Sequence, residues 1–298
     1  MLNQPIYILN QLVSLSIKRE DLLHPHISGN KFRKLPYNLA AAKASNHKQL
    51  LTFGGAFSNH IVAVAAAGKA FGFQTIGLIR GEELASQIAA NPSLQFAQEC
   101  GMQLAFLSRE QYRQKKESDF LAVCQKKYGN FYLLPAGGTN ELAVKGCEEI
   151  LTDSDEQFDY ICCAVGTGGT ISGLINRAKP QQKIIGFPAL KGDFLQEDIC
   201  KFTGNKTCTL ITDYHLGGYA KTTPEYIQFL NDFYAQHQVP LDPIYTGKMV
   251  YGVLDLIKQN YFPAGSKILL IHTGGLQGIR GMNSRLRQKN QPQINYYE

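Results

Sequence analysis

Three short segments of this 298-residue chain combine glycines with side chains that could carry out amine or anion-binding chemistry. They are residues 28–35 (SGNKFRKL), 54–60 (GGAFSNH) and 166–173 (GTGGTISG). A lysine amine can bond covalently to a carbonyl carbon, and a glycine-rich turn before a helix presents backbone N–H groups to an anion. Each segment alone is weak evidence. The basic stretch 28–35 precedes a helix predicted over 37–43, and such a stretch is more often a solvated helix start.

Two of these segments follow apolar runs and precede helical patterns. Residues 54–60 precede an alanine-rich helix predicted over 61–70, so Ser58 or Asn59 could cap that helix while its N-terminus receives a substrate carboxylate. In residues 166–170 the glycines allow a phosphate to approach the backbone, and the threonine hydroxyls add donors. No Gly-Lys-Ser/Thr ends this run, so it is not a Walker loop, and it is a weak dinucleotide fingerprint.

Short apolar runs that alternate with helical patterns must position these segments. Strands are predicted over 50–53, 75–79, 103–107, 131–134, 160–165, 183–187 and 267–271. The alternation predicts parallel sheets with helices on both faces, whose ligands gather at the carboxyl ends of strands. Four of the strands run into glycine-rich turns, which favours one shared cleft. No linker separates two halves, so we expect an inserted smaller α/β domain (45–140) within a larger domain (1–44 and 141–298).

Composition narrows the class of protein. The hydrophobic content of 44% is enough for a sizeable core, and the net charge of +6 is scattered rather than gathered in a basic arm, so no nucleic-acid partner is expected. The seven cysteines form no C-x-x-C pair and the histidines form no metal cluster, which predicts a reduced, cytoplasmic protein without a metal. Residues 1–17 do not resemble a signal peptide, and no apolar run approaches membrane-spanning length.

The segments G-N-K-x-R-K-L, G-G-x-x-S-N-H and G-T-G-G-T, followed by D-P-x-Y-T-G-K at 242–248, occur together and in order. This pattern resembles the D-cysteine desulfhydrase and 1-aminocyclopropane-1-carboxylate deaminase family, over about residues 18–280. The resemblance implies a fold type II pyridoxal-phosphate enzyme, with two open, parallel, twisted sheets flanked by helices as in the tryptophan synthase β chain. It also implies a cofactor bound to the larger domain, a small amino-acid substrate and a homodimer.

The resemblance assigns roles residue by residue. Lys31 would form the Schiff base with pyridoxal 5'-phosphate and carry the proton, and the nearby cations Arg33 and Lys34 would help to keep its amine neutral. Asn59 would bond the phenolic oxygen of the cofactor ring, and residues 166–170 would hold the phosphate. The implied cofactor contacts are Lys31, Lys34, Asn59, Gly166, Thr167, Gly168, Gly169, Thr170, Thr246 and Thr273. The implied catalytic residues are Lys31, Ser58, Tyr219 and Tyr245, and the implied substrate contacts are Ser58, Asn59 and His60.

One position separates the two activities of the family. Thr246 stands where the deaminases have a glutamate that faces the pyridine nitrogen, and Thr273 offers a hydroxyl there, as in the desulfhydrases. A hydroxyl leaves the ring a weaker electron sink than a carboxylate does, which favours elimination of a good leaving group from the β-carbon. The expected reaction converts D-cysteine to pyruvate, sulfide and ammonia.

Several alternatives remain open at this point. Ala56 and Phe57 stand where the family resemblance leads us to expect Ile and Gln, and neither the proline nor the glutamate usual before the tyrosine precedes Tyr219, so the pocket could differ in shape. The alternative activity is that of a 1-aminocyclopropane-1-carboxylate deaminase giving 2-oxobutanoate and ammonia. A nicotinamide-dependent oxidoreductase and a pyridoxal-phosphate-binding homologue without catalysis are the further alternatives.

Overall fold

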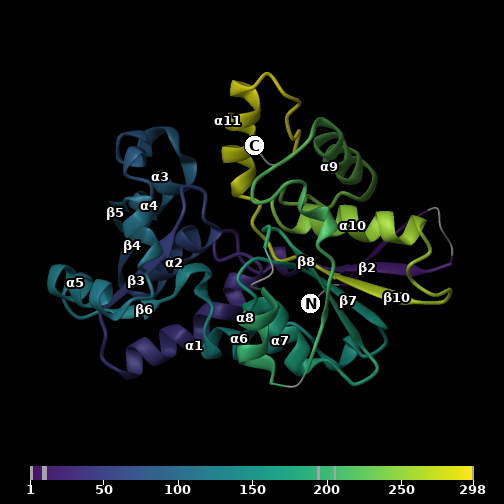
Figure 1. Cartoon of the computed structure of the whole chain (residues 1–298), viewed down its shortest axis with the longest axis horizontal. Helices are drawn as coiled ribbons and strands as arrows, with labels where there is room; N and C mark the ends of the chain where they lie inside the picture. Colours follow the sequence, from purple (N-terminus) through teal and green to yellow (C-terminus); the bar gives the residue numbers. More distant parts are fainter. Residues whose placement is uncertain (1–2, 9–11, 193–194, 205, 297–298) are drawn as a thin grey trace.

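The chain folds into two sheets flanked by helices, as Figure 1 shows for the computed structural model, which describes residues 3–8, 12–192, 195–204 and 206–296. The six-stranded sheet has the order β1-β2-β10-β7-β8-β9 and the four-stranded sheet the order β5-β4-β3-β6. The first sheet contains β1 (Asn3–Ile6), β2 (Ser14–Lys18), β7 (Tyr160–Val165), β8 (Lys183–Pro188), β9 (Thr209–Leu210) and β10 (Lys267–Ile271). The second contains β3 (Gln49–Gly54), β4 (Gln74–Arg80), β5 (Gln103–Leu107) and β6 (Tyr132–Leu134).

Strand pairing is parallel apart from the first hairpin, where β1 pairs antiparallel with β2. The predicted α/β class and all seven predicted strands are confirmed, to within one residue at each end. The sequence interpretation missed β1, β2 and β9. The alternation of Leu15 and Ile17 with polar residues could have revealed β2, whereas β1 is a short edge strand that contains Pro5 and gives little strand signal. The expected domain boundaries stay a prediction.

Helices cover both faces of each sheet, which is the arrangement that parallel sheets require. In the six-stranded sheet, α9 (Pro224–His237), α10 (Thr246–Lys258) and α11 (Gly278–Gln288) pack on one face, and α6 (Glu141–Glu148), α7 (Gly169–Arg177) and α8 (Leu195–Thr203) lie toward the other. In the four-stranded sheet, α1 (Asn30–Ala44), α2 (Asn59–Phe71) and α3 (Pro92–Glu99) pack on one face, and α4 (Arg109–Arg113) and α5 (Ser118–Tyr128) on the other. Among the described residues, no helix is long and apolar enough to cross a bilayer.

The first helix corrects one expectation. The sequence interpretation placed the basic segment 28–35 before a helix at 37–43, but α1 already begins at Asn30, so Lys31 and Lys34 lie on its first turns. Pro36 misled that interpretation. It lies inside the helix, where it lacks the N–H that would bond to the carbonyl one turn earlier, and α1 continues through it. The predicted helix over 61–70 is confirmed as α2, with Ser58 as its N-cap.

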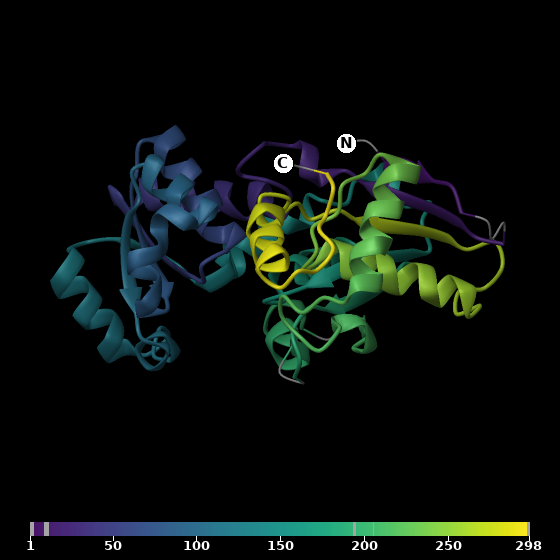
Figure 2. The same ribbon diagram turned by 90° about the horizontal axis from the view of Figure 1, so that it is seen from above.

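The two sheets meet where three of their strands end. The turn after β3 carries residues 54–60, the turn after β7 carries residues 166–170, and β10 is followed by Thr273 and Gly274. Figure 2 shows the four-stranded sheet on one side of this junction and the six-stranded sheet on the other, with α11 beside α3. All three turns line one cavity. The shared cleft expected from the glycine-rich strand ends is therefore present.

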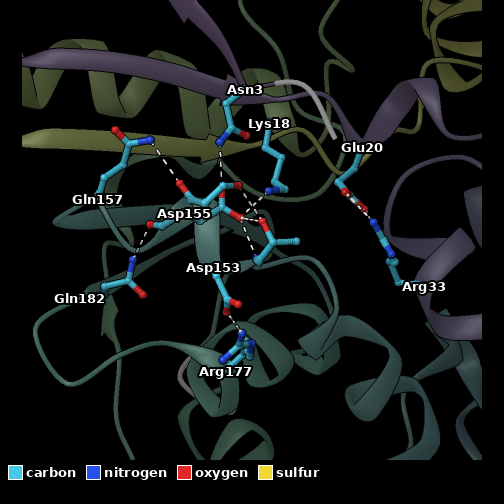
Figure 3. Close-up of polar contacts among 11 residues, drawn as sticks. Asn3, Lys18, Glu20, Arg33, Asp153, Asp155, Gln157, Arg177 and Gln182 are labelled. Carbon is cyan, nitrogen blue, oxygen red and sulfur yellow. Dashed lines mark hydrogen bonds and ion pairs between the residues drawn. The ribbon is translucent and has the colours of Figure 1, made fainter.

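A buried ion pair ties the first hairpin to the six-stranded sheet. The Lys18 Nζ lies 2.5 Å from a carboxylate oxygen of Asp155, and both side chains are almost completely buried (Figure 3). Asn3 donates to the same carboxylate, as do the backbone N–H and hydroxyl of Thr152. Burial would raise the pKa of Asp155, but these hydrogen bonds outweigh it and lower the pKa below its ordinary value. The contribution to stability is therefore present above the ordinary aspartate pKa and is lost as the pH falls.

Replacing Asp155 should destabilise the protein far more than replacing its neighbour Asp153. Asp155→Ala leaves the buried Lys18 ammonium without its carboxylate, so we expect the free energy of unfolding to fall by about 3 kcal/mol at neutral pH. Asp153 is 84% exposed in its pair with Arg177, so Asp153→Ala should cost less than about 1 kcal/mol. Urea denaturation of the two variants makes the comparison. Equal losses would contradict the assignment of Asp155 as the structural carboxylate.

Candidate active site

One cavity collects the residues that the sequence singled out, from both sheets and from α1. Its walls include a cationic helix start, two glycine-rich turns and two tyrosines. The lining residues are Asn30, Lys31, Lys34, Ser58, Asn59, His60, Gly137, Ala164, Val165, Gly166, Thr167, Gly168, Gly169, Thr170, Ile171, Leu190, Tyr219, Tyr245, Thr273 and Gly274. Thr246 is the one predicted site residue that does not line this cavity, and it lies directly behind Thr273.

The Lys31 amine faces the cavity from the first turn of α1. Its Nζ donates a hydrogen bond of 3.0 Å to Asn30 Oδ1, and Asn30 in turn donates to the Thr170 hydroxyl at 2.8 Å. Desolvation, reinforced by the charge of Lys34, lowers the pKa of Lys31 to about 7, although Cys147 and Asp242 oppose this shift. A large fraction of the amine is therefore unprotonated near neutral pH, as a nucleophile or base requires.

The predicted role of Arg33 is wrong in one respect. Its guanidinium turns away from Lys31 and bonds the buried Glu20 carboxylate at 2.8 and 3.0 Å, as Figure 3 shows. The charge of Arg33 is thus neutralised, and Lys34 is the cation that acts on Lys31. Side chains at these two positions leave the helix in different directions, which spacing in the sequence did not reveal.

The turn between β7 and α7 forms a cradle of the kind that holds a phosphate. Gly168 adopts φ +80°, and a Cβ at Gly169 would come within 2.7 Å of Thr139 Oγ1 and 3.1 Å of Lys34 Nζ, so only glycine leaves this space open. The first N–H groups of α7 have no acceptor within the helix. Lys34 Nζ reaches this turn from α1, and its hydrogen bonds among the described residues go to neutral oxygens on Gly137 and Thr139, in the adjacent turn after β6. A phosphate fits this combination of a cation, backbone donors and glycine-made space.

The turn after β3 offers a second set of donors. The Ser58 Oγ accepts a hydrogen bond from Ile61 N–H at the start of α2, which leaves the hydroxyl proton of Ser58 available to the cavity. The Asn59 amide lies against Gly275. A Cβ added at Gly275 would come within 2.6 Å of Asn59 Nδ2. The free N–H groups at this helix start suit a carboxylate.

His60 differs from its neighbours because its imidazole is buried. Its Nε2 lies 2.9 Å from the Thr52 hydroxyl, while Nδ1 has no hydrogen-bond partner among the described residues. Burial and the charges of Lys31 and Lys34 lower its pKa well below the ordinary value, although the Pro135 carbonyl opposes the shift. The ring is therefore neutral at physiological pH.

Two tyrosines and two threonines complete the cavity. The rings of Tyr219 and Tyr245 pack edge to face with centroids 6.2 Å apart. Burial raises the pKa of both hydroxyls, so both are protonated at neutral pH. The Thr246 and Thr273 hydroxyl oxygens lie 3.4 Å apart. The cavity thus ends on hydroxyl groups rather than on a carboxylate.

The nearby carboxylate of Asp242 is fully engaged. It is buried and accepts hydrogen bonds of 2.7 to 2.9 Å from the backbone N–H groups of Ile244, Tyr245 and Thr246. Sequence reasoning gave no role to Asp242, Asn30 or Lys248, although all three lie in the quoted motifs. Their position in those motifs was the signal that could have found them.

Comparisons with known proteins agree with this geometry. A family model described as pyridoxal-phosphate dependent enzyme matches residues 4–274. A Pyrococcus horikoshii protein provisionally named 1-aminocyclopropane-1-carboxylate deaminase is 32% identical over 280 residues, which cover 88% of this chain and 84% of the relative. The bifunctional D-cysteine desulfhydrase/1-aminocyclopropane-1-carboxylate deaminase of Arabidopsis thaliana, a mitochondrial protein, is 30% identical over 294 residues. The match covers 89% of this chain and 73% of that protein. A crystal structure described as an ACC deaminase homologue superposes with a TM-score of 0.79 at 29% identity. The superposition covers 92% of this chain and 88% of that chain.

The depressed pKa of Lys31 can be measured on the cofactor-free protein. Acylation of the Lys31 amine, followed by peptide mass spectrometry across a pH series, should have its midpoint at about pH 7. Lys34→Met removes a neighbouring positive charge, so the midpoint should move upward. Lys43, exposed at the far end of α1, is the internal control whose labelling must not respond to the Lys34 change. Lys31 that stays unreactive until above pH 9 would contradict the electrostatic account.

Proposed function

The chain belongs to the family of pyridoxal-phosphate dependent enzymes, and from this premise we propose that it catalyses β-elimination and deamination of a small amino acid, with D-cysteine as the leading substrate. The observation that carries the choice of reaction is the pair of hydroxyls at Thr246 and Thr273, next to a carboxylate that is already engaged. The 1-aminocyclopropane-1-carboxylate deaminase reaction is the second candidate, because related proteins carry both names.

We propose that the cofactor is held at three points. Lys31 would bond its carbonyl carbon, the turn at 166–170 together with Lys34 would hold its phosphate, and Thr273 would lie toward its pyridine nitrogen. Asn59 would support the ring from the opposite sheet. When bound, pyridoxal phosphate supplies an electron sink for the electron pair that is left when the α-proton of an amino acid is removed.

The protein's own residues then divide the remaining work. The N-terminus of α2 and the Ser58 hydroxyl bind the substrate carboxylate and so orient the α-carbon. The Lys31 amine, of which about half is neutral near pH 7, removes the α-proton. Tyr219 and Tyr245, both protonated and packed against each other, can donate a proton to the departing sulfur.

The bonds broken in this proposal balance with one water. The Cα–H bond and the Cβ–S bond of D-cysteine break, the sulfur leaves as hydrogen sulfide after taking up a proton, and 2-aminoacrylate is released. Its hydrolysis consumes one water and gives pyruvate and ammonia. No oxidant or reductant is needed. The match to the pyridoxal-phosphate dependent enzymes over residues 4–274 sets aside the nicotinamide alternative raised by the glycine-rich loop.

The hydroxyl pair supports elimination over ring opening. A carboxylate beside the pyridine nitrogen keeps that nitrogen protonated and the electron sink strong, whereas a threonine hydroxyl does not. A thiolate is a good leaving group and needs the weaker sink only. Ring opening of a cyclopropane lacks such a leaving group, so the pair favours elimination.

The first test is an assay of the purified protein with D-cysteine. We expect a visible absorbance band from the bound cofactor, a change in that band on adding substrate, and equal amounts of pyruvate and sulfide. Lys31→Ala should lose the band and the turnover, because the other lysine that lines the cavity, Lys34, is held by Gly137 and Thr139 at the proposed phosphate turn. Asp153→Ala, changed far from the cavity, is the control.

The same assay separates the alternatives. A yellow protein that is inert with D-cysteine but forms 2-oxobutanoate from 1-aminocyclopropane-1-carboxylate would replace elimination by the deaminase reaction. Turnover retained by purified Lys31→Ala would overturn the role of Lys31.

A further inference from the structure

The loop that carries Tyr219 has an unusual backbone. Leu216 and Ala220 adopt positive φ values of 55° and 54°, and Gly217 and Gly218 have φ of 88° and 117°. Positive φ is unfavourable for residues with a Cβ, so a segment of this kind relaxes unless its surroundings hold it. Tyr219 is 40% exposed, so packing of its own side chain holds the loop only in part.

A buried lysine on the neighbouring helix holds this loop. Lys248 lies on the first turn of α10, is only 2% exposed, and donates hydrogen bonds from Nζ to the carbonyl oxygens of His215 and Gly218 at 2.7 and 2.8 Å. Burying an ammonium is costly unless such acceptors compensate it. Desolvation lowers the pKa of Lys248 to about 8, and the Asp242 carboxylate opposes the shift.

The same helix start also positions the second tyrosine. Tyr245 immediately precedes α10 and packs edge to face against Tyr219. Lys248 therefore connects the element that carries Tyr245 to the loop that carries Tyr219.

We propose that Lys248 is a positioning residue: it touches neither substrate nor cofactor, but fixes the Tyr219 loop on α10 so that Tyr219 and Tyr245 act together on the departing group. The inference rests on the proposed function for its catalytic consequence, but the anchoring itself does not. His215 and Gly218 also take part in bonds inside the loop, since the His215 carbonyl accepts from Gly218 N–H and the Gly218 carbonyl accepts from Lys221 N–H. Loss of the ammonium should therefore loosen the loop rather than unfold the protein.

The first experiment measures anchoring without any assay of activity. Hydrogen exchange of the amides at 217–221 is compared between the native protein and Lys248→Met, which keeps the length of the side chain and removes its donors. We expect exchange in this loop to quicken by about tenfold, with the core strands unchanged. Lys258→Met, the same change at the exposed end of the same helix, is the control and should leave the loop as it is. Unchanged exchange in Lys248→Met would overturn the inference, whatever the substrate proves to be.

The second experiment is a double-mutant cycle with Tyr219→Phe. If Lys248 acts through Tyr219, Lys248→Met should lower kcat for D-cysteine by about tenfold in the native background and by less than about twofold in the Tyr219→Phe background, with little change in KM. A merely structural role would give the same loss in both backgrounds, and that result would overturn the proposal. So would a Tyr219→Phe variant with undiminished kcat.

A variant that keeps a donor protects the test against a folding defect. If Lys248→Met does not fold, Lys248→Gln is used in both experiments. Its amide is shorter but can still donate, so an intermediate effect in exchange and in kcat is expected, and no effect in either would overturn the proposal. A native protein that shows no turnover of D-cysteine would defeat the proposed function, while the exchange comparison would still decide the anchoring.

Discussion

The site depends on one close approach between two backbones. Gly29, at φ +57°, lies against the turn after β10, where a Cβ would overlap the Thr273 carbonyl at 2.0 Å. That carbonyl accepts the N–H of Asn30, the first residue of α1. Only glycine permits this contact. It fixes the start of α1 on the end of the central strand β10, and so brings the Lys31 amine and the Thr273 hydroxyl into one cavity although 242 residues separate them in the sequence.

The charges around this contact fall into two groups. Lys18, Arg19 and Arg33 each have a carboxylate partner within 2.9 Å and serve the framework. In contrast, the hydrogen bonds that Lys31 and Lys34 donate among the described residues go to neutral oxygens on Asn30, Gly137 and Thr139. Desolvation lowers the pKa of both amines, and the charge of Lys34 lowers the pKa of Lys31 further. Two such lysines without a carboxylate partner among the described residues suit a bound anion, as the proposed phosphate contact of Lys34 requires.

Sequence patterns predicted much of this because glycine marks the ends of the buried strands. The turns after β3 and β7 were recognised in advance, and so were the strands that precede them. What could not be predicted was the direction of side chains: Lys34 and Arg33 are adjacent, yet one enters the cavity and the other pairs with Glu20. Pro36 also concealed the start of α1, because proline is unfavourable inside a helix and α1 nevertheless continues through it. The roles of the individual site residues stay predictions.

The start of α10 shows why a motif can be recognised before its parts are understood. Within seven residues, the Asp242 carboxylate accepts the N–H groups at the helix start, Tyr245 lines the cavity, Thr246 meets Thr273, and Lys248 bonds the Tyr219 loop. Each of these contacts fixes the helix start from a different side, so a change at one position acts on the others. An acidic residue in place of Thr246 would put a second buried carboxylate beside Asp242, whose oxygens already bond three backbone N–H groups. Converting the hydroxyl pair to a stronger electron sink would therefore need compensating changes around the helix start as well.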